Sequence, residues 1–182
     1  MVDEIDILLF DEPLASLDPA AGLHTMTLID DIHQKTGKTI VIIEHRLEDV
    51  LYKKVDRIVV VNQGEIIADM TPNQLLASTL LEEVGIREPL YVTALKYAGC
   101  QITEDMNPQS LEEMNLTSCI EPVMTWFNES QGLTPYENQE VALEFKDVTF
   151  GYQVNLPILK NMSFKIHQGE MVSIVGKNGA GK

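Results

Sequence analysis

Cysteine, basic residues and long hydrophobic runs are all scarce in this sequence. Only two cysteines, Cys100 and Cys119, occur among its 182 residues. Their spacing fits neither a disulfide framework nor the Cys-x-x-Cys pattern of zinc and redox sites, so we expect two ordinary, partly buried thiols without a chemical role. The longest apolar runs are ILLF, IVII and IVVV, far below the roughly 18 apolar residues that a membrane-spanning helix needs. The chain is therefore not expected to cross a bilayer.

The first ten residues also lack the basic segment and the long apolar segment of a secretory signal peptide, which predicts a cytosolic protein. Lysine and arginine number 13 against 28 aspartates and glutamates, giving a net charge of −15. Residues 76–140 carry 11 acidic and 2 basic side chains, whereas residues 141–182 carry 3 and 5. Because an acidic surface repels a phosphate backbone, we expect no nucleic-acid partner.

Two short, almost unbroken apolar runs frame the first part of the chain. Residues 5–10 read IDILLF and residues 38–45 read KTIVIIEH. Runs without alternation predict strands that are buried on both faces of a parallel sheet. Between them, Pro19 begins a stretch with apolar residues at helical spacing that Gly37 closes, which predicts an amphipathic helix. The three elements together predict a strand–helix–strand unit.

The pattern changes twice further along the chain. LEDVLYKK has helical spacing, and DRIVVVNQGEIIADM predicts two strands around a turn at Gly64. Residues 76–138 contain helix-like patches separated by glycine and proline, and we interpret them as a connector with short helices of its own. From Val141 the strand pattern returns in VALEFKDVTF, LPILKNMSFKI and EMVSIVG.

The last seven residues, GKNGAGK, match the pattern G-x-x-x-x-G-K through Gly176, Gly181 and Lys182. Glycine is needed in such a loop because the chain must curl until its backbone N–H groups point at phosphate oxygens. The lysine would neutralise the β and γ phosphates. The preceding apolar run MVSIV supplies the strand that such a loop follows. The candidate binding residues of this loop are Gly176, Lys177, Asn178, Gly179, Ala180, Gly181 and Lys182.

Two adjacent acids, Asp11 and Glu12, follow the first apolar run. In phosphoryl transfer one acid can hold Mg²⁺ while the other orients an attacking water. Neighbouring side chains at the end of a strand point to opposite sides, so the pair can divide these tasks. An isolated Asp-Glu pair is also common on protein surfaces. The sequence ASLDP at 15–19 and His45, at the end of the second run, favour the functional interpretation.

These motifs together resemble an ABC-type ATPase. FDEP resembles the end of its Walker B motif, ASLD resembles its D-loop, and VIIEHR places His45 where the family has its switch histidine. The resemblance implies that Asp11 coordinates Mg²⁺, that Glu12 is the general base for ATP hydrolysis, and that His45 contacts the γ-phosphate. Asp18 would then act at a dimer contact. The chain from Val141 onward is similar to the start of a second such domain, with Tyr152 where the family stacks an aromatic ring on adenine.

The order of the motifs carries a further implication. In this family the phosphate loop precedes the acidic strand, but here it comes last. The resemblance therefore implies an α/β fold made of partial P-loop NTPase domains of the ABC ATPase type, with a parallel sheet, flanking helices and a mostly helical linker. We expect the end of a first domain at residues 1–75, the acidic linker at 76–138 and the start of a second domain at 139–182. The linker matches the family far less specifically than its flanks.

This arrangement predicts a piece of a larger protein with no complete catalytic site, and hence negligible ATPase activity. The motifs FDEPLASLDPAAG and EHRLEDV look most like the importer ATPases of the energy-coupling-factor type, which implies ATP and Mg²⁺ as cofactors and a second ABC ATPase domain as partner. The same resemblance implies membrane-embedded partner subunits and a position of this protein at the cytoplasmic face of the membrane. It also implies a transported solute such as a vitamin or a metal ion. The alternative is a non-catalytic interaction module, in which Tyr91, Tyr97, Trp126 and Phe127 of the linker dock a partner.

Overall fold

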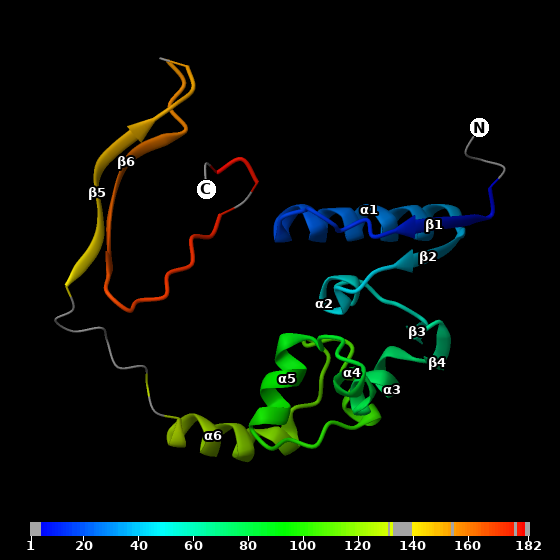
Figure 1. Ribbon diagram of the computed structural model, residues 1–182. Coiled ribbons are helices and arrows are strands. Elements are labelled where there is room, and N and C mark those ends of the chain that lie inside the picture. The colour runs from blue at the N-terminus through cyan, green and yellow to red at the C-terminus, as the bar shows by residue number, and fades with distance from the viewer. Residues whose placement is uncertain (1–4, 131, 133–139, 154, 177, 181–182) are drawn as a thin grey trace. The chain divides into compact units, whose positions relative to one another are not determined.

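The computed structural model describes residues 5–130, 132, 140–153, 155–176 and 178–180, in two compact units that divide after Gln131 (Figure 1). The first unit contains β1 (Ile7–Asp11), α1 (Pro19–Thr36), β2 (Thr39–Ile43), α2 (Leu47–Val50), β3 (Ile58–Asn62), β4 (Glu65–Met70), α3 (Pro72–Ala77), α4 (Leu80–Glu83), α5 (Leu90–Tyr97), two 3₁₀ helices η1 (Glu104–Met106) and η2 (Thr117–Cys119), and α6 (Ile120–Glu129). The second unit contains β5 (Val141–Phe150) and β6 (Leu159–His167).

The predicted strand–helix–strand unit is confirmed. β1 and β2 pair in parallel, with Ile7 opposite Thr39 and Asp11 opposite Ile43. Helix α1, which lies along β1 in Figure 1, begins where the Asp18 side chain accepts a hydrogen bond from the Ala21 N–H at 3.0 Å. It ends at Gly37, whose φ of 65° lies in the left-handed region that glycine adopts without strain.

Burial on both faces of these strands was predicted, and the structure differs. One face packs on Leu14 and on Met26 and Ile29 of α1, through Phe10, Ile40 and Ile42. The other face keeps four apolar side chains 44–64% exposed, namely Ile7, Leu9, Val41 and Ile43. A two-stranded pair with a helix on one side has nothing of its own to cover the second side. The prediction of two buried faces is therefore wrong for this chain.

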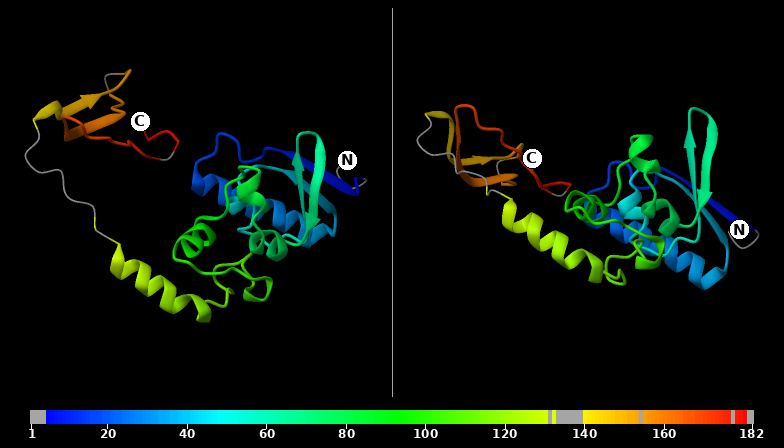
Figure 2. Two further views of the ribbon diagram at one scale, coloured as in Figure 1. Left: turned by 60° about the horizontal axis from the view of Figure 1, so that its bottom comes forward. Right: turned by 90° about the horizontal axis from the view of Figure 1, so that it is seen from below.

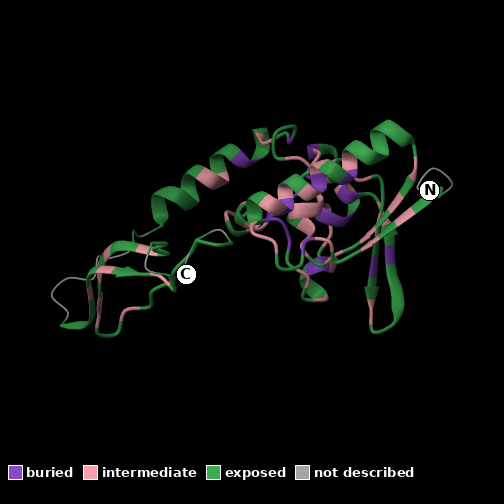
Figure 3. Cartoon of the chain, turned by 90° about the horizontal axis from the view of Figure 1, so that it is seen from above, coloured by how far each residue is buried: buried purple, intermediate pink, exposed green. Residues whose placement is uncertain are grey.

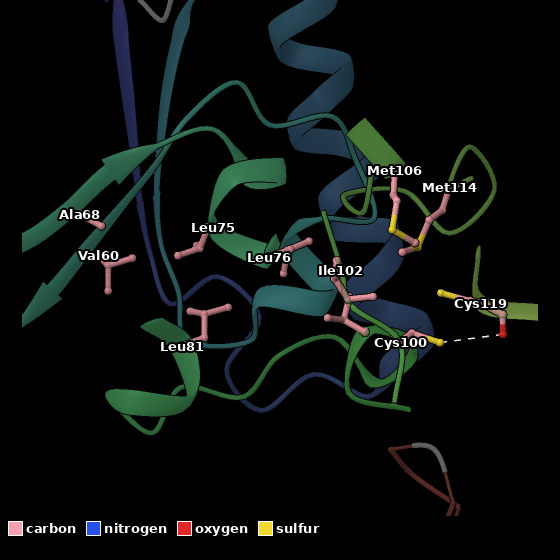
Figure 4. Packing of buried hydrophobic residues seen from close by; sticks show 11 residues of the cluster. Val60, Ala68, Leu75, Leu76, Leu81, Cys100, Ile102, Met106, Met114 and Cys119 are labelled. Atoms are coloured by element: carbon pink, nitrogen blue, oxygen red, sulfur yellow. Dashed lines mark hydrogen bonds between the residues drawn. The ribbon is translucent and has the colours of Figure 1, made fainter. Parts of the chain in front are cut away.

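The main hydrophobic core lies further along the first unit. β3 and β4 form an antiparallel hairpin, turning at Gln63 and Gly64 with φ values of 51° and 86°. Figure 4 shows how residues from the hairpin and from the following helices meet. The buried members of this core are Val60, Ala68, Leu75, Leu76, Leu81, Val92, Cys100, Ile102, Met106, Met114 and Cys119. One core therefore includes residues on both sides of the expected boundary between the first domain, which ends at 75, and the linker, which begins at 76.

Short helices lie within the expected connector, and the helix α3 runs across its expected start, from Pro72 to Ala77. Thr71 caps α3 in a capping box, accepting from the Gln74 N–H at 3.3 Å while Gln74 Oε1 accepts from the Thr71 N–H at 3.1 Å. Leu75 and Leu76 of this helix are completely buried. Two further views show the same arrangement of the first unit (Figure 2). Residues of the expected connector are thus packed into the core of the first unit.

The second unit is a twisted hairpin of β5 and β6. Phe145 and Phe164 stack across it with ring centroids 4.5 Å apart. All its described residues are exposed or half-buried, in contrast to the purple core of the first unit (Figure 3). The third predicted strand, at 171–175, has no strand pairing in the structure, and Met171 and Val175 are 98% and 84% exposed. A strand needs a neighbour to satisfy its backbone groups, and this segment has none within the described part of its unit.

Candidate functional site

The two adjacent acids lie where β1 ends. Asp11 is the last residue of β1, and Glu12 continues the pairing because its N–H donates to the Ile43 carbonyl at 2.9 Å. Both residues are exposed. Glu12 has a φ of 45°, a left-handed backbone that costs a residue with a side chain on the order of 1 kcal/mol. Strained backbone of this kind is typical of functional sites, where the fold holds a side chain in a required direction.

His45 lies at the same edge, because β1 and β2 are parallel and both end there. Its imidazole is 71% exposed, and its Nδ1 lies 3.3 Å from Oε1 of Glu44. The structure thus brings Asp11, Glu12 and His45 to one edge of the strand pair. The sequence predicted this grouping from the position of each residue directly after an apolar run.

Glu44 was not among the predicted residues, although it organises this edge. Its side chain is only 1% exposed. Oε2 accepts from the Leu14 N–H at 3.3 Å, and Oε1 accepts from the N–H groups of His45 and Arg46 at 3.0 and 3.3 Å. A buried carboxylate is tolerated when backbone donors satisfy it in this way. The signal that marked Asp11, an acid directly after an apolar run, also applies to Glu44.

Arg46 fixes the same loop from the other side. One guanidinium nitrogen, Nη1, donates to the Leu14 carbonyl at 3.0 Å, and Nη2 pairs with Asp49 at 2.5 Å. Leu14, which is completely buried, is therefore held through its N–H by Glu44 and through its carbonyl by Arg46. The loop between β1 and α1 is anchored to the end of β2 by these two side chains.

Asp18 has a structural task in this unit as the N-cap of α1. A carboxylate at a helix N-terminus satisfies a free N–H group and interacts favourably with the helix dipole. The sequence assigned Asp18 to a dimer contact, which stays a prediction. Ser16, two residues earlier, has a φ of 64°. The ASLD segment is thus a tightly turned loop that leads into α1.

The second unit carries the glycine-rich segment and Tyr152. Gly176, Asn178, Gly179 and Ala180 are described and exposed, and Gly179 has a φ of 79°. Lys177, Gly181 and Lys182 lie outside the described residues. The turn conformation at Gly179 agrees with the need for glycine, and phosphate binding by this loop stays a prediction.

Tyr152 follows β5 and presents most of its ring to solvent. The side chain is 85% exposed, and the ring meets Phe150 edge-on with centroids 5.3 Å apart. The preceding Gly151 is required by space, since a Cβ there would lie 2.4 Å from the Leu156 carbonyl oxygen. An exposed aromatic face held by an edge contact can stack on a flat ring.

The residues present fit Mg²⁺ only in part. Among the residues that the structure describes, no three His, Cys, Asp or Glu side chains gather as a metal site. Mg²⁺ prefers one or two carboxylates and takes its remaining ligands from phosphates and water. Asp11, exposed at the end of β1, suits this minimal role.

The linker aromatics divide into two groups. Tyr91 is partly buried and packs against the main core. Its hydroxyl donates to the Pro108 carbonyl at 2.6 Å. Burial, and secondarily the charge of Glu48, raise the pKa of Tyr91 to about 12. Tyr97, Trp126 and Phe127 are instead 77%, 44% and 70% exposed.

The two cysteines are buried neighbours in the linker core. Cys100 Sγ donates to the Cys119 carbonyl at 3.9 Å, as Figure 4 shows. Burial, followed by the hydrogen bond and charge of Cys119, raises the pKa of Cys100 to about 11. A thiol with such a pKa is protonated at neutral pH and weakly nucleophilic, as expected for a cysteine without a chemical role.

Comparison with known families finds a match on the linker. A family model described as "ATP-binding cassette cobalt transporter" matches residues 78–150. The match covers most of the linker, which resembled the family least from its motifs, and extends through β5. Among the described residues, no helix is long and apolar enough to span a membrane.

Curated relatives match the whole chain. Proteins provisionally named ABC transporter ATP-binding protein are 54% identical in Vibrio parahaemolyticus, 52% in Vibrio vulnificus strain YJ016 and 52% in Clostridium perfringens, each over all of this chain. The chain spans 31–32% of the length of these relatives. A solved structure titled cbiO1 from Clostridium perfringens, part of the ABC transporter complex cbiONQ, is 28% identical over 51% of this chain and 37% of its own, with a TM-score of 0.39. That score is too low to support an argument about fold.

Proposed function

We propose that this chain contributes to an ATP-hydrolysing subunit of an ABC-type importer. The support is that the chain matches, over its whole length, part of proteins provisionally named ABC transporter ATP-binding protein. Residues 1–75 would be the end of a first ATPase domain, residues 76–138 a linker, and residues 139–182 the start of a second domain. Both parts would then belong to P-loop NTPase folds. Such a subunit couples ATP hydrolysis to the uptake of a small solute, such as a vitamin or a metal ion.

The observation that carries the proposal is the strained, exposed Glu12 at the end of β1. Its backbone is fixed by a hydrogen bond to Ile43, and its φ of 45° is one that a side-chain-bearing residue adopts at a cost. In the proposed site Glu12 is the general base that takes the proton of the attacking water. His45, exposed at the same edge, would contact the γ-phosphate, and Glu44 would hold the backbone of His45 in place through its hydrogen bond.

Bound Mg²⁺ would supply charge neutralisation on the phosphates, and Asp11 is the residue that would hold it. In the second domain, Tyr152 would stack on adenine, and residues 176–182 would surround the phosphates with backbone N–H groups. These two sets of residues would serve different nucleotides, because they come from successive domains. The proposed partners are a second ABC ATPase domain and membrane-embedded subunits, at the cytoplasmic face of the membrane.

The test uses a longer protein that contains this segment together with complete nucleotide-binding domains. Glu12→Gln should lower the rate of ATP hydrolysis about 10²–10⁴-fold, since an amide cannot accept the proton. ATP binding should persist, because the phosphate loop is unchanged. The matched control is Glu65→Gln on the exposed β3–β4 hairpin, where the same change should leave turnover intact. Normal turnover in the Glu12→Gln protein would refute the assignment of the base.

A second function, a non-catalytic interaction module, is favoured by one specific observation. The linker residues share one core with the β3–β4 hairpin, so the linker is folded, and its helix α6 has no buried residue. A folded linker that presents aromatic side chains to solvent can bind a partner without nucleotide. Loss of ATP hydrolysis in the Glu12→Gln protein would favour the ATPase. If the linker of that same variant still captures a partner while hydrolysis is unaffected, the module is favoured.

A further inference from the structure

Residues at the end of α5 and along α6 line a shallow groove. Figure 1 shows the two helices that contribute them. Its volume is about 510 Å³, and Ala98 and Gly99, which follow α5, are among the residues that line it. Tyr97 of α5 and Trp126 of α6 also line it. The groove is open, since Tyr97 remains 77% exposed.

The charge of this groove has one sign. Glu121 and Glu129 of α6 both line it, and they are exposed. The nearest cation in sequence, Lys96, is already engaged: its Nζ lies 2.5 Å from Glu88, and it also donates to the Ser78 carbonyl at 3.1 Å. Glu88 is itself 9% exposed, so this pair is held in the body of the linker. The two groove carboxylates are thus not neutralised by Lys96.

A groove lined by both carboxylates and aromatic side chains suits an arginine. A guanidinium can stack flat on Trp126 or Tyr97 through a cation–π contact while its edge pairs with a carboxylate. Lysine can form the ion pair but lacks the planar face. Ala98 and Pro122 add small apolar surface to the same groove, which suits apolar residues that flank the arginine.

We propose that the α5–α6 groove is a docking site for a protein partner that presents an arginine between apolar residues. The charge of the groove selects against acidic partners. The proposal is independent of nucleotide chemistry, because none of its residues is assigned to the ATPase site. It also concerns a different face of α6 from Ile120, Met124 and Phe127, for which nothing indicates an occupant.

Trp126 is the only tryptophan in the sequence, so its fluorescence reports directly on the groove. The full 182-residue chain is titrated with a synthetic peptide that carries an arginine between leucines. We expect a saturable change in Trp126 emission. Replacing the arginine of the peptide by citrulline, which has the same shape without the charge, should weaken binding about tenfold, and lysine should give an intermediate affinity.

Variants of the chain test the acidic residues. Glu121→Gln together with Glu129→Gln should weaken binding of the arginine peptide about fivefold. Glu82→Gln with Glu112→Gln makes the same charge change at exposed positions outside the groove, and it should leave the affinity unchanged. Because Glu121 lies in the first turn of α6 and can support the helix, Glu129→Gln alone is the second test. It lies in the last turn, where losing a negative charge favours the helix.

Several outcomes would overturn the proposal. Equal binding of the arginine and citrulline peptides would show that the groove does not select a cation. Equal losses in the groove and control variants would assign the effect to net charge. A change in Trp126 emission with protein concentration alone would indicate a second copy as the occupant, and a change with neutral phosphatidylcholine vesicles would indicate lipid. Failure of the ATPase assignment to Glu12 would alter none of these results.

Discussion

Single side chains decide the geometry of the strand edge at which Asp11, Glu12 and His45 lie. Glu44 is the most consequential of them, because its two carboxylate oxygens accept hydrogen bonds from three backbone N–H groups that belong to two separate segments. Removing one acceptor from a buried site leaves a donor without a partner, which costs about 1–3 kcal/mol. The position of the loop after β1 therefore depends on a charge that the sequence alone did not single out.

Replacing Glu44 by glutamine tests this dependence. The amide keeps one oxygen, which can serve His45 and Arg46, but its NH₂ group would face the Leu14 N–H as a second donor. We expect the free energy of unfolding to fall by about 1–3 kcal/mol, measured by urea denaturation with far-UV circular dichroism. The control is again Glu65→Gln on the exposed hairpin. Equal stability of both variants would contradict a bridging role for Glu44.

Cys100 provides a second test at this scale. Its pKa is raised from 9.0 to about 11, which lowers the thiolate fraction near neutral pH about 100-fold. Alkylation by iodoacetamide should therefore be slow in the folded chain and fast in denaturant. The folded thiol keeps its proton to a higher pH than the unfolded one. The contribution of this difference to the free energy of unfolding should therefore be fully present below about pH 9 and be lost as the pH rises toward about 11. Rapid alkylation of the folded chain at neutral pH would contradict the burial.

At the scale of elements, β5 and β6 depend on a close approach of backbone at the end where residues 151–158 connect them. The Phe150 carbonyl accepts from the Ile158 N–H at 2.7 Å, next to Gly151. A side chain at position 151 would collide with the backbone of Leu156 and Pro157. Tyr152, whose ring is exposed, follows directly after this glycine.

Gly151→Ala should therefore loosen the second unit. A Cβ at 2.4 Å from a carbonyl oxygen cannot be accommodated without a backbone shift, and such overpacking typically costs about 1–3 kcal/mol. Faster hydrogen exchange of the β5 and β6 amides, followed by mass spectrometry, is the expected result. Gly132→Ala is the matched control, because a Cβ there meets nothing within 4 Å. Unchanged exchange in Gly151→Ala would show that the turn adapts freely.

At the scale of the whole molecule, the chain consists of two units with different kinds of candidate residues. The first unit carries the acids and the histidine, and the second carries the glycine-rich segment and the tyrosine. In the proposed subunit these sets serve different nucleotides. The proposed general base, Glu12, would then share no domain with the glycine-rich segment at 176–182. Catalysis by positioning and electrostatic stabilisation needs all groups around one nucleotide.

The corresponding prediction concerns the 182-residue chain by itself. We expect ATP hydrolysis at the background rate, measured as phosphate release, and no further loss when Glu12 is replaced by glutamine. A longer protein with complete domains, assayed in parallel, supplies the positive control. Turnover by the 182-residue chain at an ordinary enzyme rate, on the order of 10 per second, would contradict the separation of the two sets.

Much of the local structure could be predicted from the sequence, for identifiable reasons. Pro19 and Gly37 marked the ends of α1 because proline suits the first turn and glycine the left-handed cap. The β3–β4 hairpin followed from its turn residues. The strand predicted at 171–175 failed because an apolar run becomes a strand only when a neighbouring strand pairs with it. The sequence could not separate the buried from the exposed aromatic residues of the linker, because Tyr91 and Tyr97 differ only in what packs around them.

The sequence by itself determined the motifs, their order along the chain and the local elements, because capping, turn formation and hydrophobic spacing act over a few neighbouring residues. Only the tertiary structure decided which side chains are buried together. It joined the linker to the β3–β4 hairpin in one core, placed Glu44 as the anchor of the strand edge, and opened a groove between α5 and α6. These features depend on contacts between distant residues, which no local pattern encodes.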